Sequence, residues 1–205
     1  MNTVITSEKI DLPPGAVLKL LGTWEDYQRM LLVLGDRSIP RIKYRRGEIL
    51  LMTPLPEHGR DVSLLADIAK VVLDHLNLRY DSFTPITMSL PKFSGIEPDY
   101  CFYIENWRSV VGKSRIDWEN DPPPDLAIEI DVTSYTDVDD YLPYQVPEVW
   151  ILKNRNLLVY KLQNGAYMLG ESRYFANISE LMQQCFKIAS QETTSEAIRW
   201  LKKFL

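Results

Sequence analysis

The sequence predicts a mixed α/β protein of the α+β kind, in which helices flank a central mixed β-sheet. One long amphipathic helix, expected at Glu57–Leu78, stands between groups of short apolar strands, and two helix-like segments close the chain. A length of 205 residues suits one domain with a sizeable core. We therefore expect an N-terminal arm over residues 1–22 and a single domain over residues 23–205.

The first elements are an irregular arm and a short helix. Pro-Pro-Gly at positions 13–15 interrupts regular structure, so residues 1–22 are expected to wrap the domain or fray. Thr23 is a candidate N-cap for a helix from Trp24 to about Leu34. Asp26 lies where the acid of a capping box belongs, which strengthens this prediction.

A hairpin and the longest helix follow. Arg41–Tyr44 and Glu48–Met52 flank a turn and predict two paired strands. The apolar residues of Glu57–Leu78 recur at helical spacing, at Val62, Leu65, Ala69, Val72 and Leu76. At about 100° per residue, His58 lies nearly opposite Asp74 of the polar stripe. His58 is therefore expected to point from the first turn toward the interior.

The rest of the chain alternates between strands and helices. Strands are predicted at Ser82–Leu90, Tyr100–Ile104, Leu126–Val132, Glu148–Leu152, Leu157–Leu162 and Tyr167–Glu171. Asn164-Gly165 predicts the turn between the last two strands. Helical segments are predicted at Val138–Leu142, Ser179–Ile188 and Thr194–Phe204.

Composition narrows the class of protein. There is no apolar run of about 18 residues and no basic, apolar leader at the start, so we expect no membrane span and a cytoplasmic location. Cys101 and Cys185 lack metal-ligand spacing and are interpreted as packing residues. The net charge of −5 argues against a protein that coats nucleic acid, but does not exclude a nuclease.

Acidic residues concentrate in one window of the chain. Residues 116–152 contain ten carboxylates and no Lys or Arg. Those from Asp117 to Asp121 are interpreted as a solvated loop, whereas Glu129 and Asp131 have apolar neighbours. Because side chains alternate along a strand, Glu129 and Asp131 share one face, about 7 Å apart, opposite the core face.

A second acid can join this face. Asp99 follows Pro98, which favours the first position of a strand or an edge. If the strands of Asp99 and Glu129 pair, their carboxylates come within reach of one hard cation. Mg²⁺ prefers such a site, with one or two carboxylates, waters and a substrate phosphate.

Here the sequence resembles a known family. Pro98-Asp99 followed by Glu129-Ile130-Asp131 resembles the PD-(D/E)XK nuclease signature, with Asp131 in the place of its lysine. More specifically, residues 23–204 resemble the Uma2 family, also called DUF820, of restriction-endonuclease-like proteins. The further matching features are Gly47-Glu48-Ile49, Met52-Thr53-Pro54, His58, Pro124-Asp125-Leu126, Val146-Pro147-Glu148-Val149-Trp150 and Ala197-Ile198-Arg199-Trp200-Leu201.

The resemblance implies a restriction endonuclease-like core and cleavage of DNA phosphodiesters that depends on Mg²⁺ or Mn²⁺. It implies Asp99 and Glu129 as metal ligands, helped by the backbone carbonyl of Ile130, with Glu48 as a third acid. Members commonly carry a lysine before the segment Val146-Pro147-Glu148, where this chain has none. Lys153 is a candidate replacement, and Gln145 a weaker polar one. A homodimer is expected from the way such nucleases reach both strands.

Several alternatives stay open. His58 is either a general base, a partner of a metal ligand, or a buried histidine bonded to backbone. Lys153 is either the replacement lysine or a surface residue. A basic group in the hairpin either contacts phosphate or protects a sheet edge: Arg41, Lys43, Arg45 and Arg46.

Three functions are compatible with these residues. The first is the metal-dependent DNA endonuclease. The second is a non-enzymatic descendant that binds DNA or a protein, favoured by Asp131 and by the absence of lysine from residues 116–152. The third is a glycosidase with paired carboxylates, which fits less well because acids on adjacent strands are suited to sharing a cation.

Overall fold

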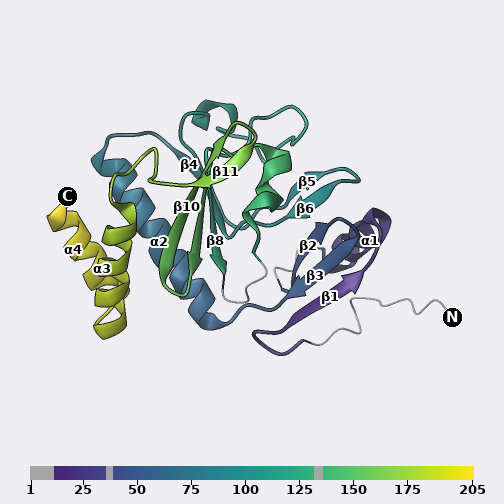
Figure 1. Cartoon of the computed structure of the whole chain (residues 1–205), viewed down its shortest axis with the longest axis horizontal. Coiled ribbons are helices and arrows are strands. Elements are labelled where there is room, and N and C mark those ends of the chain that lie inside the picture. Colours follow the sequence, from purple (N-terminus) through teal and green to yellow (C-terminus); the bar gives the residue numbers. More distant parts are fainter. Residues whose placement is uncertain (1–11, 36–38, 132–135) are drawn as a thin grey trace. The chain divides into compact units, whose positions relative to one another are not determined.

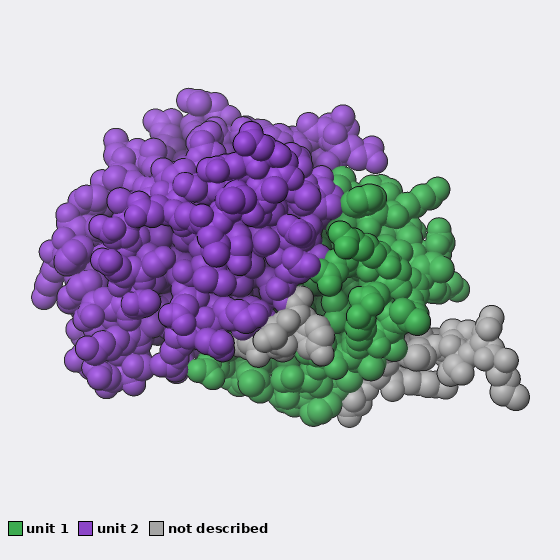
Figure 2. Space-filling view, viewed as in Figure 1, with its two compact units in different colours: residues 1–59, 87–97 green, residues 60–86, 98–205 purple. Residues whose placement is uncertain are grey.

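The computed structural model describes residues 12–35, 39–131 and 136–205. Two units are distinguished: unit 1 comprises Met1–Gly59 and Thr87–Glu97, and unit 2 comprises Arg60–Ile86 and Pro98–Leu205 (Figure 2). Helix α2, Pro56–His75, begins in unit 1 and continues in unit 2. Each unit is built around its own β-sheet and its own hydrophobic cluster.

Unit 1 contains an antiparallel sheet with helix α1 on one face (Figure 1). The strands run in the order β1-β3-β2-β6-β5. Their bounds, with that of α1, are β1 Val17–Leu21, α1 Trp24–Leu34, β2 Arg41–Arg45, β3 Glu48–Met52, β5 Met88–Leu90 and β6 Ser94–Ile96. Trp24 and Tyr27 of α1 pack against Tyr44 of β2, so aromatic contacts dominate this small core.

Local sequence signals explain α1. The Thr23 hydroxyl accepts a hydrogen bond from Asp26 N–H, and the Asp26 side chain accepts one from Thr23 N–H, which together form the predicted capping box. The helix ends at Gly35, whose φ of 55° suits a residue without a Cβ. The predicted helix and the hairpin of β2 and β3 are therefore confirmed.

Three strands of unit 1 differ from what the sequence predicts. The irregular stretch expected over residues 1–22 is wrong for Val17–Leu21, which form edge strand β1 against β3. Strand β6 was not predicted, because three residues around Gly95 carry no clear pattern. Gly95 is needed there, since a Cβ would collide with the ring of Tyr27. β5 is one half of the strand predicted at Ser82–Leu90.

Unit 2 contains the mixed sheet that the sequence predicts. Its strands run in the order β11-β10-β9-β8-β7-β4, and β8 and β9 form a parallel pair. The elements are β4 Asp81–Phe83, β7 Tyr100–Tyr103, the 3₁₀ turn η2 Trp107–Ser109, β8 Leu126–Asp131, the 3₁₀ helix η3 Val138–Tyr144, β9 Glu148–Lys153, β10 Asn156–Gln163, β11 Ala166–Leu169, α3 Ile178–Gln191 and α4 Thr194–Phe204.

Helices cover one face of this sheet. Side chains of α2, α3 and α4 share a hydrophobic cluster with Leu126, Ile128 and Ile130 of β8, and Figure 1 shows the three helices on that side. Burying each such side chain contributes about 1.5–3 kcal/mol to folding. The predicted core face of β8 is thus confirmed, and Glu129 and Asp131 lie on the opposite face.

Two boundaries in unit 2 differ from the prediction. α2 ends at His75 rather than Leu78, because Asn77 adopts a left-handed φ of 54°, which asparagine tolerates. The single strand predicted at Ser82–Leu90 is wrong: β4 pairs with β7 of unit 2, whereas β5 pairs with β6 of unit 1. Pro85 lies between them and cannot donate to a ladder. Val132 of the predicted strand Leu126–Val132 lies outside the described residues.

Two further predictions, on the two cysteines and on the turn between β10 and β11, are confirmed. Cys101 and Cys185 are both buried, and burial raises their pKa values to about 12 and about 11, as expected of packing residues. Asn164 and Gly165 both have positive φ in the turn between β10 and β11, as predicted. Across the described ranges, none of the helices has the length and apolarity needed to cross a membrane.

Candidate active site

Asp99 occupies the position before strand β7. Its side chain is fully buried, and its Oδ2 accepts a hydrogen bond from Ile130 N–H at 2.6 Å. The antiparallel register pairs Tyr100 with Ile128, so Asp99 extends the pairing to a place opposite Glu129. The pairing of these two strands, on which the predicted site depends, is therefore present.

Glu129 lies on the face of β8 turned away from the three helices. It is 3% exposed, and its Oε1 accepts a hydrogen bond from the Tyr141 hydroxyl at 2.7 Å. Tyr141 comes from η3 and is itself buried. Burial, and next the charge of Glu129, raise the pKa of Tyr141 well above its ordinary value, so its hydroxyl remains a neutral donor.

Asp131 and Lys153 form an ion pair across the parallel strands. The β8–β9 register sets them side by side, and Lys153 Nζ lies 2.9 Å from Asp131 Oδ2. The Asp131 side chain is 1% exposed and the Lys153 side chain 38%. Neither oxygen of Asp131 has a hydrogen bond of good geometry within the described ranges, so the attraction is mainly that of two charges.

Ile130 connects the acids through its backbone. Its side chain lies in the hydrophobic cluster on the helix-covered face, while its N–H reaches Asp99. Strand β8 thus presents Glu129 and Asp131 on one face and holds Asp99 through the residue between them.

Glu48 and His58 belong to unit 1, whereas Asp99, Glu129 and Lys153 belong to unit 2. Glu48 begins β3 and forms an ion pair with Lys19 at 2.5 Å. His58 is 6% exposed in the first turn of α2, which confirms that it points inward. Their membership in the catalytic site stays a prediction.

Comparisons with known proteins show the family of the chain and its fold. The model of the Uma2 family, described as "Putative restriction endonuclease", matches residues 24–186. The chain belongs to the Uma2 family. The fold is similar to the crystal structure of a "putative nuclease belonging to DUF820" from Anabaena variabilis, at 17% identity and a TM-score of 0.51. That likeness covers 87% of this chain and 98% of the other, and confirms the predicted fold class. No curated protein matches.

Two acids of the Uma2-like motifs are structural. Asp125 accepts hydrogen bonds from Ile104 N–H, Glu105 N–H, Asn106 N–H and the Asn106 amide, at 2.6–3.0 Å. Glu148 accepts from Trp150 Nε1 at 2.6 Å and from Arg173 N–H at 2.8 Å. Hydrogen bonds therefore stabilise these buried carboxylates without a cation.

One of the basic residues of the hairpin, Lys43, is buried, whereas Arg46 is exposed. Arg41 and Lys43 lie on one face of β2, opposite Ile42, and Lys43 is 6% exposed. Their positive charges lower the pKa of half-buried Glu97, but desolvation outweighs these charges and the hydrogen bonds of Glu97, so its pKa is raised. A role of this group in contacting phosphate stays a prediction.

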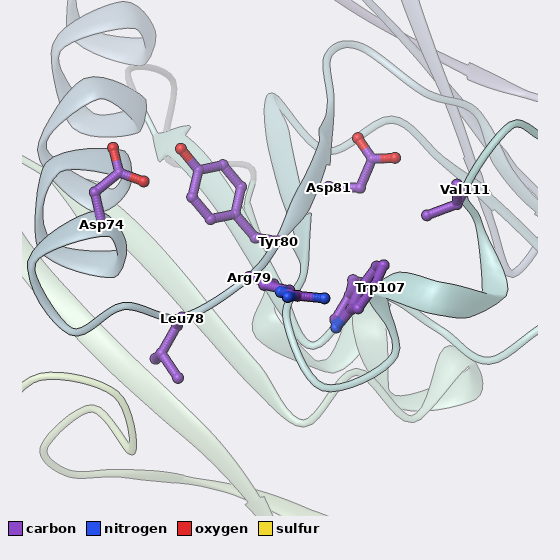
Figure 3. Close-up of a pocket in the computed structure, with 7 residues that line it drawn as sticks. All are labelled: Asp74, Leu78, Arg79, Tyr80, Asp81, Trp107 and Val111. Carbon is purple, nitrogen blue, oxygen red and sulfur yellow. The ribbon is translucent and has the colours of Figure 1, made fainter.

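A pocket in unit 2 lies away from the acids of the candidate site. It has a volume of about 600 Å³ and is lined by residues near the end of α2 and around Trp107: Asp74, Leu78, Arg79, Tyr80, Asp81, Trp107 and Val111 (Figure 3). The Asp81 position pairs with Tyr103, at the end of β7 remote from Asp99. This pocket contains none of the predicted site residues.

The sequence analysis missed Tyr141. The sequence signal was the tyrosine inside the segment where the family commonly has a lysine, but only the return of η3 over the sheet shows that it reaches Glu129. Among the described residues, no group of three or more His, Cys, Asp and Glu is arranged to hold a metal. A metal site formed by the two carboxylates of Asp99 and Glu129 stays a prediction.

Proposed function

We propose that this Uma2 protein is an endonuclease that hydrolyses phosphodiester bonds in DNA with a divalent cation. The observation that carries the proposal is the hydrogen bond from Ile130 N–H to Asp99 Oδ2, because it holds Asp99 against the strand of Glu129. The family's description, "Putative restriction endonuclease", supports the same chemistry.

The donor set fits Mg²⁺ or Mn²⁺. Asp99, Glu129 and the backbone carbonyl of Ile130 would hold the cation. Mg²⁺ typically takes a few hard oxygen ligands from the protein, and waters and substrate phosphate complete its coordination shell. Such a cation, when bound, supplies an activated water and offsets charge developing on the phosphate.

Lys153 replaces the lysine of the PD-(D/E)XK signature, whose place in this chain is occupied by Asp131. Asp131 fixes its ammonium group at 2.9 Å, while its 38% exposure leaves that group accessible to a docked phosphate. An ammonium group is suited to orienting the attacking water and to offsetting phosphate charge. We include Glu48 as a third acid and His58 as a general base or as a partner of a metal ligand.

One observation favours a second function. The charge of Lys153 is balanced by Asp131, the residue that replaces the usual lysine. A chain in which this ion pair keeps the ammonium from the phosphate would bind DNA or another protein without cleaving it. This non-catalytic module is the alternative that the assay must separate from the nuclease.

The test incubates purified protein with supercoiled plasmid or single-stranded DNA, in Mg²⁺, Mn²⁺ or EDTA. Asp99→Asn and Glu129→Gln remove a charge without changing size, and Glu180→Gln does the same at an exposed position of α3. We expect metal-dependent cleavage by the wild type and by Glu180→Gln, and its loss in both site variants. Cleavage that survives Asp99→Asn and Glu129→Gln would refute the site.

Two further results complete the comparison. DNA binding without cleavage in any metal would support the non-catalytic module. Sedimentation of the same protein tests the homodimer that we propose for cleavage of both strands.

A further inference from the structure

The hydroxyl of Tyr141 donates a hydrogen bond to the proposed metal ligand Glu129. The O–H···O distance is 2.7 Å, and the two residues are 1% and 3% exposed. A hydrogen bond from a neutral hydroxyl to a carboxylate is among the stronger ones, and both groups here are shielded from competing water. The contact therefore restricts the side-chain torsions of Glu129.

The local fold fixes where the hydroxyl points. Asp137 caps the start of η3, where its side chain accepts from Asp139 N–H at 3.1 Å, and Gln145 follows the helix with a left-handed φ of 56°. The helix packs against β9, the neighbour of β8, and against the edge strand β11. With its ring buried and only two side-chain torsions, Tyr141 delivers a donor to one place on the sheet.

We propose that Tyr141 is a positioning residue: its hydroxyl holds the Glu129 carboxylate in the orientation that binds the divalent cation. The inference rests on the proposed function and adds a residue to it. Partners that orient metal ligands typically change metal affinity by about 10–100-fold when removed. A purely structural tyrosine would affect folding and leave the affinity of the folded protein for the metal unchanged.

The test measures Mn²⁺ binding by calorimetry in the absence of DNA. Tyr141→Phe removes only the hydroxyl, and Glu129→Gln removes the ligand charge. Tyr103→Phe is the matched control, because Tyr103 is a fully buried tyrosine of β7 whose hydroxyl has no hydrogen-bond partner within the described ranges. We expect Mn²⁺ affinity to fall about tenfold or more in Tyr141→Phe and to be unchanged in Tyr103→Phe.

A second measurement separates positioning from folding. In the cleavage assay, Tyr141→Phe should lower kcat while the KM for DNA stays constant, because Glu129 is proposed to serve the catalytic step and not the binding of DNA. If Tyr141→Phe does not fold, 4-aminophenylalanine at position 141 keeps the shape and a weaker N–H donor, and should show intermediate Mn²⁺ affinity.

The outcomes distinguish the two proposals. Equal Mn²⁺ affinity in the wild type and in a folded variant at position 141, with loss in Glu129→Gln, would overturn the role of Tyr141 and leave the proposed function intact. Absence of Mn²⁺ binding by the wild type would overturn both.

Discussion

Removing either partner of the Asp131–Lys153 ion pair should have unequal effects on stability. The aspartate side chain is 1% exposed and the lysine side chain 38%. In Lys153→Met the buried carboxylate loses its cation, whereas in Asp131→Asn the ammonium can turn toward water. We therefore expect Lys153→Met to be the more destabilising change, although lysine is the more exposed residue.

The distances set the magnitudes. At 2.9 Å and an effective dielectric constant of about 20, the Coulomb attraction is about 6 kcal/mol. Desolvation of the aspartate offsets much of it, and the partial exposure of lysine screens more. We expect a loss of about 2–3 kcal/mol in Lys153→Met, below the 3–5 kcal/mol typical when a fully buried pair loses one partner. For Asp131→Asn we expect about 1 kcal/mol or less.

Urea unfolding at pH 7 gives both free energies, and the double variant gives the coupling between the two residues. Lys187→Met is the control, because Lys187 is an exposed residue of α3. Equal losses in the two single variants, or a larger loss in Asp131→Asn, would refute the view that burial of the carboxylate determines the cost.

Three further predictions can be checked on the same protein. Asp125→Asn should lower the free energy of unfolding by about 1–3 kcal/mol, because an amide cannot accept from both the backbone N–H groups and the Asn106 side chain; urea unfolding measures this. Burial raises the pKa of Glu97 above 4.5, so folding favours its protonated form. Wild-type stability should therefore fall relative to Glu97→Gln as pH rises from about 4 to 7, as unfolding across that range will show. Calorimetry should give one transition if residues 23–205 form the predicted single domain, and two transitions would contradict that prediction.

Local signals made much of the fold predictable. The capping box of Thr23 and Asp26, the apolar stripe of α2 and the Asn164-Gly165 turn each act within a few residues of sequence. Short strands are different, since β5 and β6 have three residues each and exist because they pair with each other. A three-residue pattern cannot specify such partners. This is why the segment Ser82–Leu90 was predicted as one strand, although it contributes β4 to the sheet of unit 2 and β5 to the sheet of unit 1.

The candidate site was predictable where it depends on alternation and not where it depends on register. Alternation along β8 correctly separated Glu129 and Asp131 from the core residues. The adjacency of Asp131 and Lys153 requires the parallel register of β8 and β9, which a sequence pattern does not fix. The contact of Tyr141 with Glu129 requires η3 to fold back over the sheet, which is also a tertiary property.

Asp125 shows how acceptor positions separate structural acids from metal ligands. It begins the segment that leads to Glu129 and is as buried as Asp99, so sequence and burial alone would make it a candidate ligand. Both oxygens of the Asp125 carboxylate accept hydrogen bonds, four in all, from three backbone N–H groups and one amide. Oδ2 accepts from the three backbone N–H groups and Oδ1 from the Asn106 amide, so a cation at Asp125 would compete with an established set of hydrogen bonds. In this chain the acid of Pro124-Asp125-Leu126 therefore anchors the loop after β7, and the metal site that we propose belongs to Asp99 and Glu129.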